Sequence, residues 1–188
     1  MTIQIIPATI QQAEPVAKLL LEAMEDLIYF YIGKNDKEKA LAFLENQFKL
    51  KNTIYSHSNS FVAKKDEEVV GVLVAYNGRS HFELQQELIT FLKLNHNFKS
   101  HLNPETEADE FYIDALSVNP DMRGQKIGSK LIYFAENHAK ENNYKHIGLL
   151  VDKENPAAKR LYHRLGFVFI NAVKLEQHCY EHLQKKSL

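Results

Sequence analysis

The feature that most constrains the fold of this chain is a strand-like run that a short turn connects to a long helix. The turn contains glycines and cationic residues. The run covers residues 111–118, and its aromatic and branched side chains favour a β-strand. After the turn, apolar residues recur at helical spacing at Ile127, Leu131, Phe134 and Ala135. The turn therefore ends at a helix N-terminus, where free backbone N–H groups and the helix dipole favour an anion such as a phosphate.

The rest of the chain alternates between strand and helix patterns. Further strands are expected at residues 3–6, 60–64, 69–76, 145–151, 167–170 and around 178–183. Further helices are expected after Thr9 and at about residues 37–50, 82–99 and 156–165. This order predicts an α/β fold, an α+β mixed sheet with helices on both faces. No repeat or Pro/Gly-rich linker divides the 188 residues, so a single domain spanning 1–188 is expected.

Composition and charge exclude several classes of function. The formal net charge of −1 gives no basic field for nucleic acid, so we expect no nucleic-acid partner. Cys179 is the only cysteine, which rules out an internal disulfide and fits a reducing cytoplasm. No run approaches the roughly 18 apolar residues of a membrane helix, and the N-terminus lacks a signal-peptide pattern. A cytoplasmic protein without a membrane partner is therefore expected.

Two kinds of site are not expected. The nine histidines include no pair with zinc-ligand spacing on a helix, and His178 and His182 fall in a predicted strand, so no metal is expected. A P-loop nucleotide enzyme is also disfavoured, because no Gly-Lys-Ser/Thr follows the glycines of the turn.

Two motifs carry a resemblance to a known family. The first is Val118-x-Pro120-x-x-Arg123-Gly124-x-x-Ile127-Gly128. The second, about thirty residues later, is Asn155-x-Ala157-Ala158-x-x-Leu161-Tyr162-x-x-Leu165-Gly166-Phe167. Together they resemble the acetyl-CoA-binding signature and the following helix motif of the GCN5-related N-acetyltransferase (GNAT) superfamily. The resemblance implies a GNAT-like acyl-CoA N-acyltransferase fold with a mostly antiparallel sheet, in which the 82–99 helix is an addition between the third and fourth strands.

The resemblance implies that acetyl-CoA is the co-substrate and that the turn holds its pyrophosphate. The cofactor-binding residues of the turn would be Arg123, Gly124, Gln125, Lys126, Ile127, Gly128 and Ser129. The strand before the turn is expected to splay from the next strand, so that main-chain groups of Leu116, Ser117 and Val118 pair with the pantetheine arm. Asn155 is expected to cap its helix and to contact the cofactor as well.

Lys126 stands where the family signature has a glycine. Glycine at that position lets the backbone approach a phosphate without a side chain. Lysine must turn its side chain aside there, although it could add charge to the pyrophosphate. Binding is expected to persist, because the donors of the turn come from the main chain.

The implied chemistry is direct attack of an amine on the thioester. An amine with a pKa near about 10 must lose a proton to become a nucleophile. Asp114 is a candidate base, expected on one strand face with Tyr112 and Leu116, but a structural carboxylate is an equally good interpretation. Glu110 is the second candidate. Tyr162 matches the family's tyrosine acid, with a packed tyrosine as the alternative, and the Leu116 N–H is the expected donor to the thioester oxygen.

Two functions remain open from the sequence. The first is an acetyl-CoA-dependent N-acetyltransferase acting on a primary amine of a small molecule or peptide. The second is a non-catalytic acyl-CoA-binding or regulatory module on the same fold. Aromatic residues at 29–31 and acidic residues at 105–110 point to a cationic acceptor. The 82–99 helix covers the acceptor pocket, forms a homodimer contact or packs in the core.

Overall fold

The computed structural model describes residues 2–175 and 178–187, and it contains one seven-stranded mixed sheet with the strand order β1-β2-β3-β4-β5-β7-β6. The strands are β1 (Ile3–Pro7), β2 (Ser60–Lys65), β3 (Glu68–Asn77), β4 (Glu110–Val118), β5 (His146–Asp152), β6 (Val168–Leu175) and β7 (His178–Lys186). The helices are α1 (Ala13–Ile32), α2 (Lys37–Lys49), α3 (His81–His96), α4 (Ile127–Glu141) and α5 (Pro156–Arg164). The predicted α/β fold with a mostly antiparallel sheet is confirmed, since only β4 and β5 pair in parallel.

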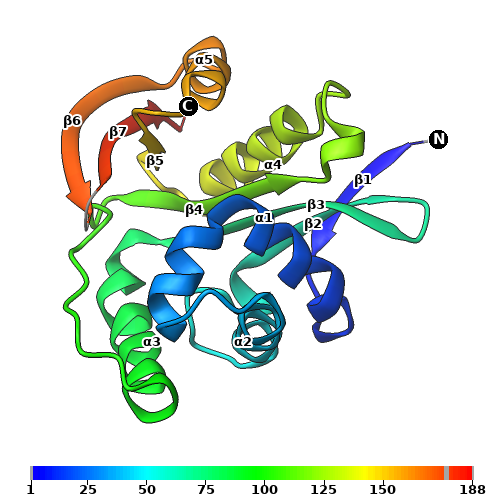
Figure 1. Ribbon diagram of the computed structural model, residues 1–188. Helices are drawn as coiled ribbons and strands as arrows, with labels where there is room; N and C mark the ends of the chain where they lie inside the picture. The colour runs from blue at the N-terminus through cyan, green and yellow to red at the C-terminus, as the bar shows by residue number, and fades with distance from the viewer. Residues whose placement is uncertain (1, 176–177, 188) are drawn as a thin grey trace.

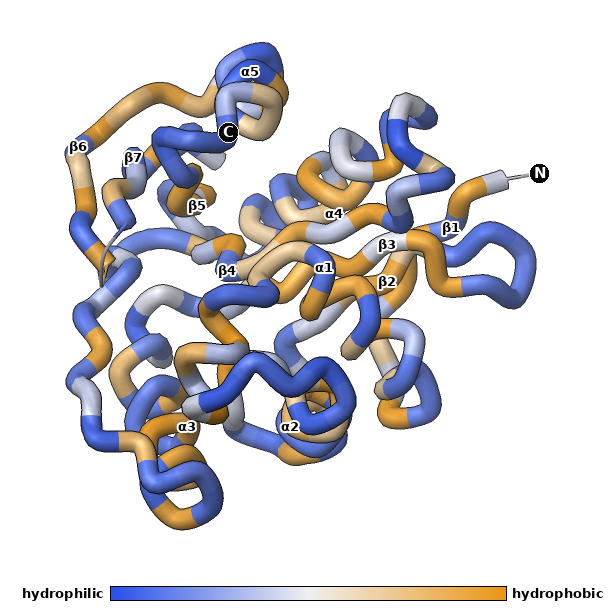
Figure 2. The backbone as a smooth tube through the Cα atoms, in the orientation of Figure 1, coloured by the Kyte–Doolittle hydropathy of each residue, from blue (hydrophilic) through white to orange (hydrophobic). Residues whose placement is uncertain are grey.

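The helices cover both faces of the sheet (Figure 1). Helices α1, α2 and α3 share one hydrophobic core with one face of the sheet, and α4 and α5 share a second core with the other face. The central strands carry long hydrophobic stretches, whereas the turn between β2 and β3 is hydrophilic (Figure 2). Because β3 and β4 contribute side chains to both cores, they are held from both sides, which gives any site on them a rigid base.

The aromatic residues at 29–31 lie in the last turns of α1. The helix passes through a non-helical residue at Met24 (φ −143°, ψ 37°) and ends at Gly33 in the left-handed conformation (φ 71°). Ile28, Tyr31 and Ile32 are buried in the core against the sheet. Core packing is therefore the interpretation that the structure supports for these three side chains.

Helix α3 occupies the place of the predicted 82–99 helix. Its apolar stripe, Leu84, Leu88 and Leu92, is buried in the same core as α1, so this stripe is core packing. Phe82 and Leu94 face outward and are 67% and 80% exposed. Within the described ranges, neither α3 nor any other helix combines the length and the hydropathy that a membrane crossing requires.

Strands β4 and β5 pair over only part of their length. The parallel ladder joins Glu110–Ile113 to His146–Leu149 and then stops, although both strands continue. Beyond Ile113, β4 is paired to β3 alone, through Ala115 to Val118. The predicted splay between these strands is thus confirmed, and it leaves one backbone edge of β4 open.

Candidate active site

The open edge of β4 presents alternate backbone groups. Asn119 N–H donates to the Val70 carbonyl at 3.0 Å, which shows that residue 119 directs its backbone toward β3. Since backbone direction alternates along an antiparallel strand, Ser117 also faces β3, and Leu116 and Val118 face the open side. Of the three residues expected to receive the pantetheine arm, Leu116 and Val118 therefore offer the free N–H groups.

The turn after β4 presents a second set of free donors. The N–H of Lys130 donates to the Lys126 carbonyl at 3.0 Å, and this is where the α4 hydrogen bonds begin. In the described part of the chain, no hydrogen bond is donated by the N–H groups of residues 124–129. The first turn of α4 has neither an acidic residue nor a side-chain cap. These donors and the positive end of the helix dipole make a site for an anion.

Lys126 adopts the conformation that the family's glycine would favour. Its backbone lies in the left-handed region (φ 61°, ψ 19°), two residues after Gly124 at φ 80°. The loop shape is thus kept with a lysine, at a cost of roughly 1–2 kcal/mol for a residue with a Cβ atom. A Cβ atom at Gly128 would meet Leu116, Val118 and Leu161 at an ordinary 3.9 Å. The start of α4 therefore lies against both the open β4 segment and α5.

Arg123 and Asn155 flank this region. The Arg123 guanidinium lies 3.9 Å from Glu22 Oε1 of α1, with both side chains more than half exposed. Solvent weakens such a pair, so Arg123 remains available to an anionic ligand. Asn155 Oδ1 accepts a hydrogen bond from the Ala158 N–H at 3.0 Å, which is the predicted helix cap. Its contact with the cofactor stays a prediction.

Tyr162 is almost completely buried. The residue is 9% exposed and packs in the core, with its ring centroid 6.0 Å from that of Phe167. Burial raises the pKa of the Tyr162 phenol to about 12. Its hydroxyl makes no hydrogen bond to the rest of the described chain. The phenol therefore holds its proton throughout the neutral range, as a general acid must before it acts.

Asp114 occupies a β-bulge. The β3–β4 register passes from Ala75↔Ile113 to Val74↔Ala115, so Asp114 is the extra residue. Downstream of the bulge, Leu116 packs in the core beside α4, whereas Tyr112 and Ala115 lie in the opposite core. The expectation that Asp114 and Tyr112 share a face with Leu116 is therefore wrong for Leu116, because the bulge shifts the alternation by one residue.

The carboxylate of Asp114 is partly exposed and strongly perturbed. The Tyr76 hydroxyl donates to Asp114 Oδ2 at 2.6 Å. Burial raises the pKa of Asp114 to about 6, while this hydrogen bond opposes the rise. The nearby Glu105 accepts from the Tyr112 hydroxyl at 3.2 Å. Burial and the charge of Asp114 raise the pKa of Glu105 to about 8. In residues 2–175 and 178–187, no lysine, arginine or histidine forms an ion pair with either carboxylate.

The model of the acetyltransferase (GNAT) family matches residues 21–167 of this chain. The chain belongs to the GNAT family of acetyltransferases. It is 32% identical over 113 residues to the acetyltransferase Atu2258 of Agrobacterium fabrum, an alignment that covers 59% of this chain and 81% of that relative.

Solved structures of N-acetyltransferases have the same fold as this GNAT protein. One from Staphylococcus aureus Mu50 superposes with a TM-score of 0.83 at 21% identity, over 97% of this chain and 100% of that one. The PaiA N-acetyltransferase of Thermoplasma acidophilum, in complex with coenzyme A, superposes with a TM-score of 0.64 at 18% identity, over 99% of each chain.

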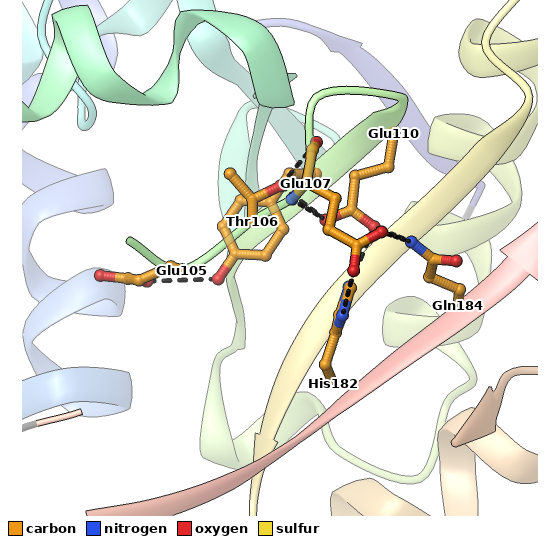
Figure 3. A network of polar contacts seen from close by, with 7 residues as sticks. Glu105, Thr106, Glu107, Glu110, His182 and Gln184 are labelled. Atoms are coloured by element: carbon orange, nitrogen blue, oxygen red, sulfur yellow. Dashed lines mark hydrogen bonds and ion pairs between the residues drawn. The ribbon is translucent and has the colours of Figure 1, made fainter. Parts of the chain in front are cut away.

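Glu110, the second candidate base, is enclosed in a polar network (Figure 3). Its carboxylate is fully buried and accepts hydrogen bonds from Thr106 Oγ1 (2.5 Å), the Glu107 N–H (3.1 Å) and Gln184 Nε2 (2.8 Å), and it lies 3.0 Å from His182 Nε2. Burial alone would raise the pKa of Glu110, but the contact with His182 and the hydrogen bonds from Thr106 and the Glu107 N–H hold it below its ordinary value. A carboxylate with its oxygens occupied in this way fastens the loop before β4 to β7, and an acceptor amine has no access to it.

Sequence reasoning did not single out Tyr76, His81 or Glu105. Tyr76 and His81 lie 38 and 33 positions from Asp114 in the sequence, and no short motif connects them. Glu105 was visible only as one of several acids in a polar loop. Within the described ranges, no group of three or more histidine, cysteine, aspartate or glutamate side chains could hold a metal ion.

Proposed function

We propose that this GNAT protein is an acetyl-CoA-dependent N-acetyltransferase that acetylates a primary amine of a small molecule or peptide by direct attack. The open edge of β4 beside the uncapped N-terminus of α4 carries the proposal. These two features supply extended main-chain donors and an anion site that meet at Gly128, which suits a long ligand with a pyrophosphate. The coenzyme A in the PaiA complex is consistent with this assignment.

The loop from Arg123 to Ser129 would bind the pyrophosphate through its backbone, with Arg123 adding charge. The N–H groups of Leu116 and Val118 would bind the pantetheine arm along β4. The Leu116 N–H would also stabilise the oxyanion of the thioester, because it lies only two residues after Asp114, the bulged residue that acts as the base. Asn155 would contact the same ligand from the start of α5.

In the transfer, the amine nitrogen forms a bond to the acetyl carbon while the bond from that carbon to sulfur breaks. The amine reacts in its neutral form, after its ammonium proton has passed to solvent. The proton that the nitrogen loses on bond formation passes to Asp114, whose raised pKa of about 6 suits a base that is ionised at neutral pH. The departing thiolate takes the proton of Tyr162. Exchange with solvent then returns Asp114 and Tyr162 to their starting states, so no proton is gained or lost by the protein.

Thiol release from acetyl-CoA across a panel of amines tests this function. We expect release that depends on the amine and that falls at least about tenfold in Tyr162→Phe and in Asp114→Asn. Coenzyme A binding without turnover on aliphatic, aromatic and peptide amines would instead identify a non-catalytic acyl-CoA-binding module. Absence of coenzyme A binding would contradict both functions.

A further inference from the structure

A chain of two hydrogen bonds leads from Asp114 back into the protein core. The Tyr76 hydroxyl lies 2.6 Å from Asp114 Oδ2 and 3.0 Å from His81 Nδ1. Tyr76 and His81 are each 4% exposed, and their rings stack with centroids 6.1 Å apart and an interplanar angle of 13°. They come from different elements, the end of β3 and the first residue of α3. Two buried side chains therefore hold Asp114 in place, Tyr76 by a direct hydrogen bond and His81 through Tyr76.

The protons that Tyr76 and His81 carry decide which group donates in each of these hydrogen bonds. The single proton of the Tyr76 hydroxyl is donated to the carboxylate, because an ionised Asp114 can only accept. His81 must then donate from Nδ1 to the Tyr76 oxygen. Burial lowers the pKa of His81 to about 4, so the ring is neutral and carries one proton. Its Nε2 atom is buried and has no partner in the described chain, so Tyr76 alone selects the tautomer with the proton on Nδ1.

Other titratable groups also surround Asp114. Tyr112 lies on β4, Glu105 on the loop before it, and Tyr55 on the segment before β2. Burial raises the pKa of all three groups most, and the charge of Asp114 is among the further causes for each, which places them within electrostatic reach of Asp114. The hydrogen bond to Asp114 comes from a fourth group, the hydroxyl of Tyr76.

We propose that His81 and Tyr76 are positioning residues for the acyl transfer. His81 orients the Tyr76 hydroxyl, and this hydroxyl holds Asp114 through Oδ2 so that the carboxylate can receive the proton of the acceptor amine. The proposal rests on the proposed function, since it assigns these residues to the base of that reaction. The proposal adds a hydrogen-bonded chain that connects the reacting carboxylate of Asp114 with His81 at the start of α3.

The test compares the pH profile of kcat/KM with the titration of Asp114, followed by carbon NMR of the labelled carboxyl. Tyr76→Phe removes the donor and keeps the ring, so the acid limb and the Asp114 pKa should both move up by roughly one pH unit. His81→Phe should move both in the same direction by less. His81→Asn, which can donate from nearly the same place, should restore the wild-type values. In the Tyr76→Phe background, His81→Phe should cause no further shift.

Four outcomes separate the possibilities. Shifts in the order expected, with rescue by His81→Asn, support the proposal. An unchanged acid limb in folded Tyr76→Phe overturns it, while transfer by the wild-type protein leaves the proposed function standing. Independent, additive effects of the two substitutions also overturn it, because residues that act through one hydrogen-bonded chain are not additive. Absence of transfer by the wild-type protein overturns the proposed function, and the proposal with it, even where the Asp114 titration shifts.

Discussion

The carboxylate of Glu110 on β4 lies directly over the Cα atom of Gly148 on β5. A Cβ atom at residue 148 would overlap both carboxylate oxygens of Glu110. The absence of a side chain at Gly148 therefore makes room for the network that joins β4, β7 and the loop before β4. This loop carries Glu105, so a glycine on β5 helps to place a carboxylate beside Asp114.

Gly148→Ala should destabilise the protein. The new methyl group has no space beside Glu110, and overpacking of a buried site costs about 1–3 kcal/mol. Chemical denaturation of the variant measures this loss. Gly128→Ala is the matched control, because its Cβ atom would meet only ordinary contacts at 3.9 Å and alanine is the better helix former. A stability of Gly148→Ala equal to that of the wild-type protein would contradict the close contact.

Glu110→Gln should lower stability at neutral pH while preserving catalysis. The folded protein holds the pKa of Glu110 below its ordinary value, so the ionised carboxylate contributes stability above that value and loses it as the pH falls through the folded pKa. The loss should be about 2–4 kcal/mol at neutral pH and should shrink on acidification. Denaturation at several pH values and kcat at saturating acceptor measure the two effects. A large fall in kcat with little change in stability would assign Glu110 to the chemistry instead.

The stability of Glu105→Gln, compared with that of the wild-type protein at the same pH, should increase as the pH rises. The pKa of Glu105 is raised from 4.5 to about 8 in the folded state. The folded protein therefore retains a proton that the unfolded chain releases, and wild-type stability falls as the pH rises between these values. The glutamine variant avoids this loss, which we expect to be at least about 1 kcal/mol. Parallel denaturation series at low and high pH check it, and a constant difference between the two proteins would refute it.

Substitutions of Lys126 should separate the effect of its backbone conformation from the effect of its side-chain charge. Lys126→Gly suits the left-handed conformation and should leave stability unchanged or raise it by up to about 1 kcal/mol. Lys126→Val should lower stability and coenzyme A affinity, because a branched residue is strained at positive φ. Lys126→Asn tolerates this conformation without the charge, so its affinity reports on the charge alone. Calorimetric titration with coenzyme A measures all three, and equal affinities for valine and glycine would contradict the assigned loop conformation.

The sequence predicted the elements of this fold well and the details of its site less well. Period and turn signals are local, so the β2–β3 hairpin and the β4-turn-α4 unit could be located from neighbouring residues alone. The kink at Met24 and the bulge at Asp114 depend on packing between distant segments. The bulge moved Leu116 to the other face of the sheet, and this could not be derived from simple alternation. In the same way, the contact from His81 through Tyr76 to Asp114 exists only once β3, β4 and α3 are assembled.

Tracing a labelled acetyl group tests the central claim most directly. Labelled acetyl-CoA is mixed with a stoichiometric amount of the protein, first alone and then with an amine that supports thiol release, and the products are separated after rapid quenching. Direct attack with Asp114 and Tyr162 predicts no label on the protein, label in the amine in amounts equal to the free thiol, and slow transfer in Tyr162→Phe. Label that accumulates on the protein before the amine is added, or thiol release without an acetylated amine, would contradict it.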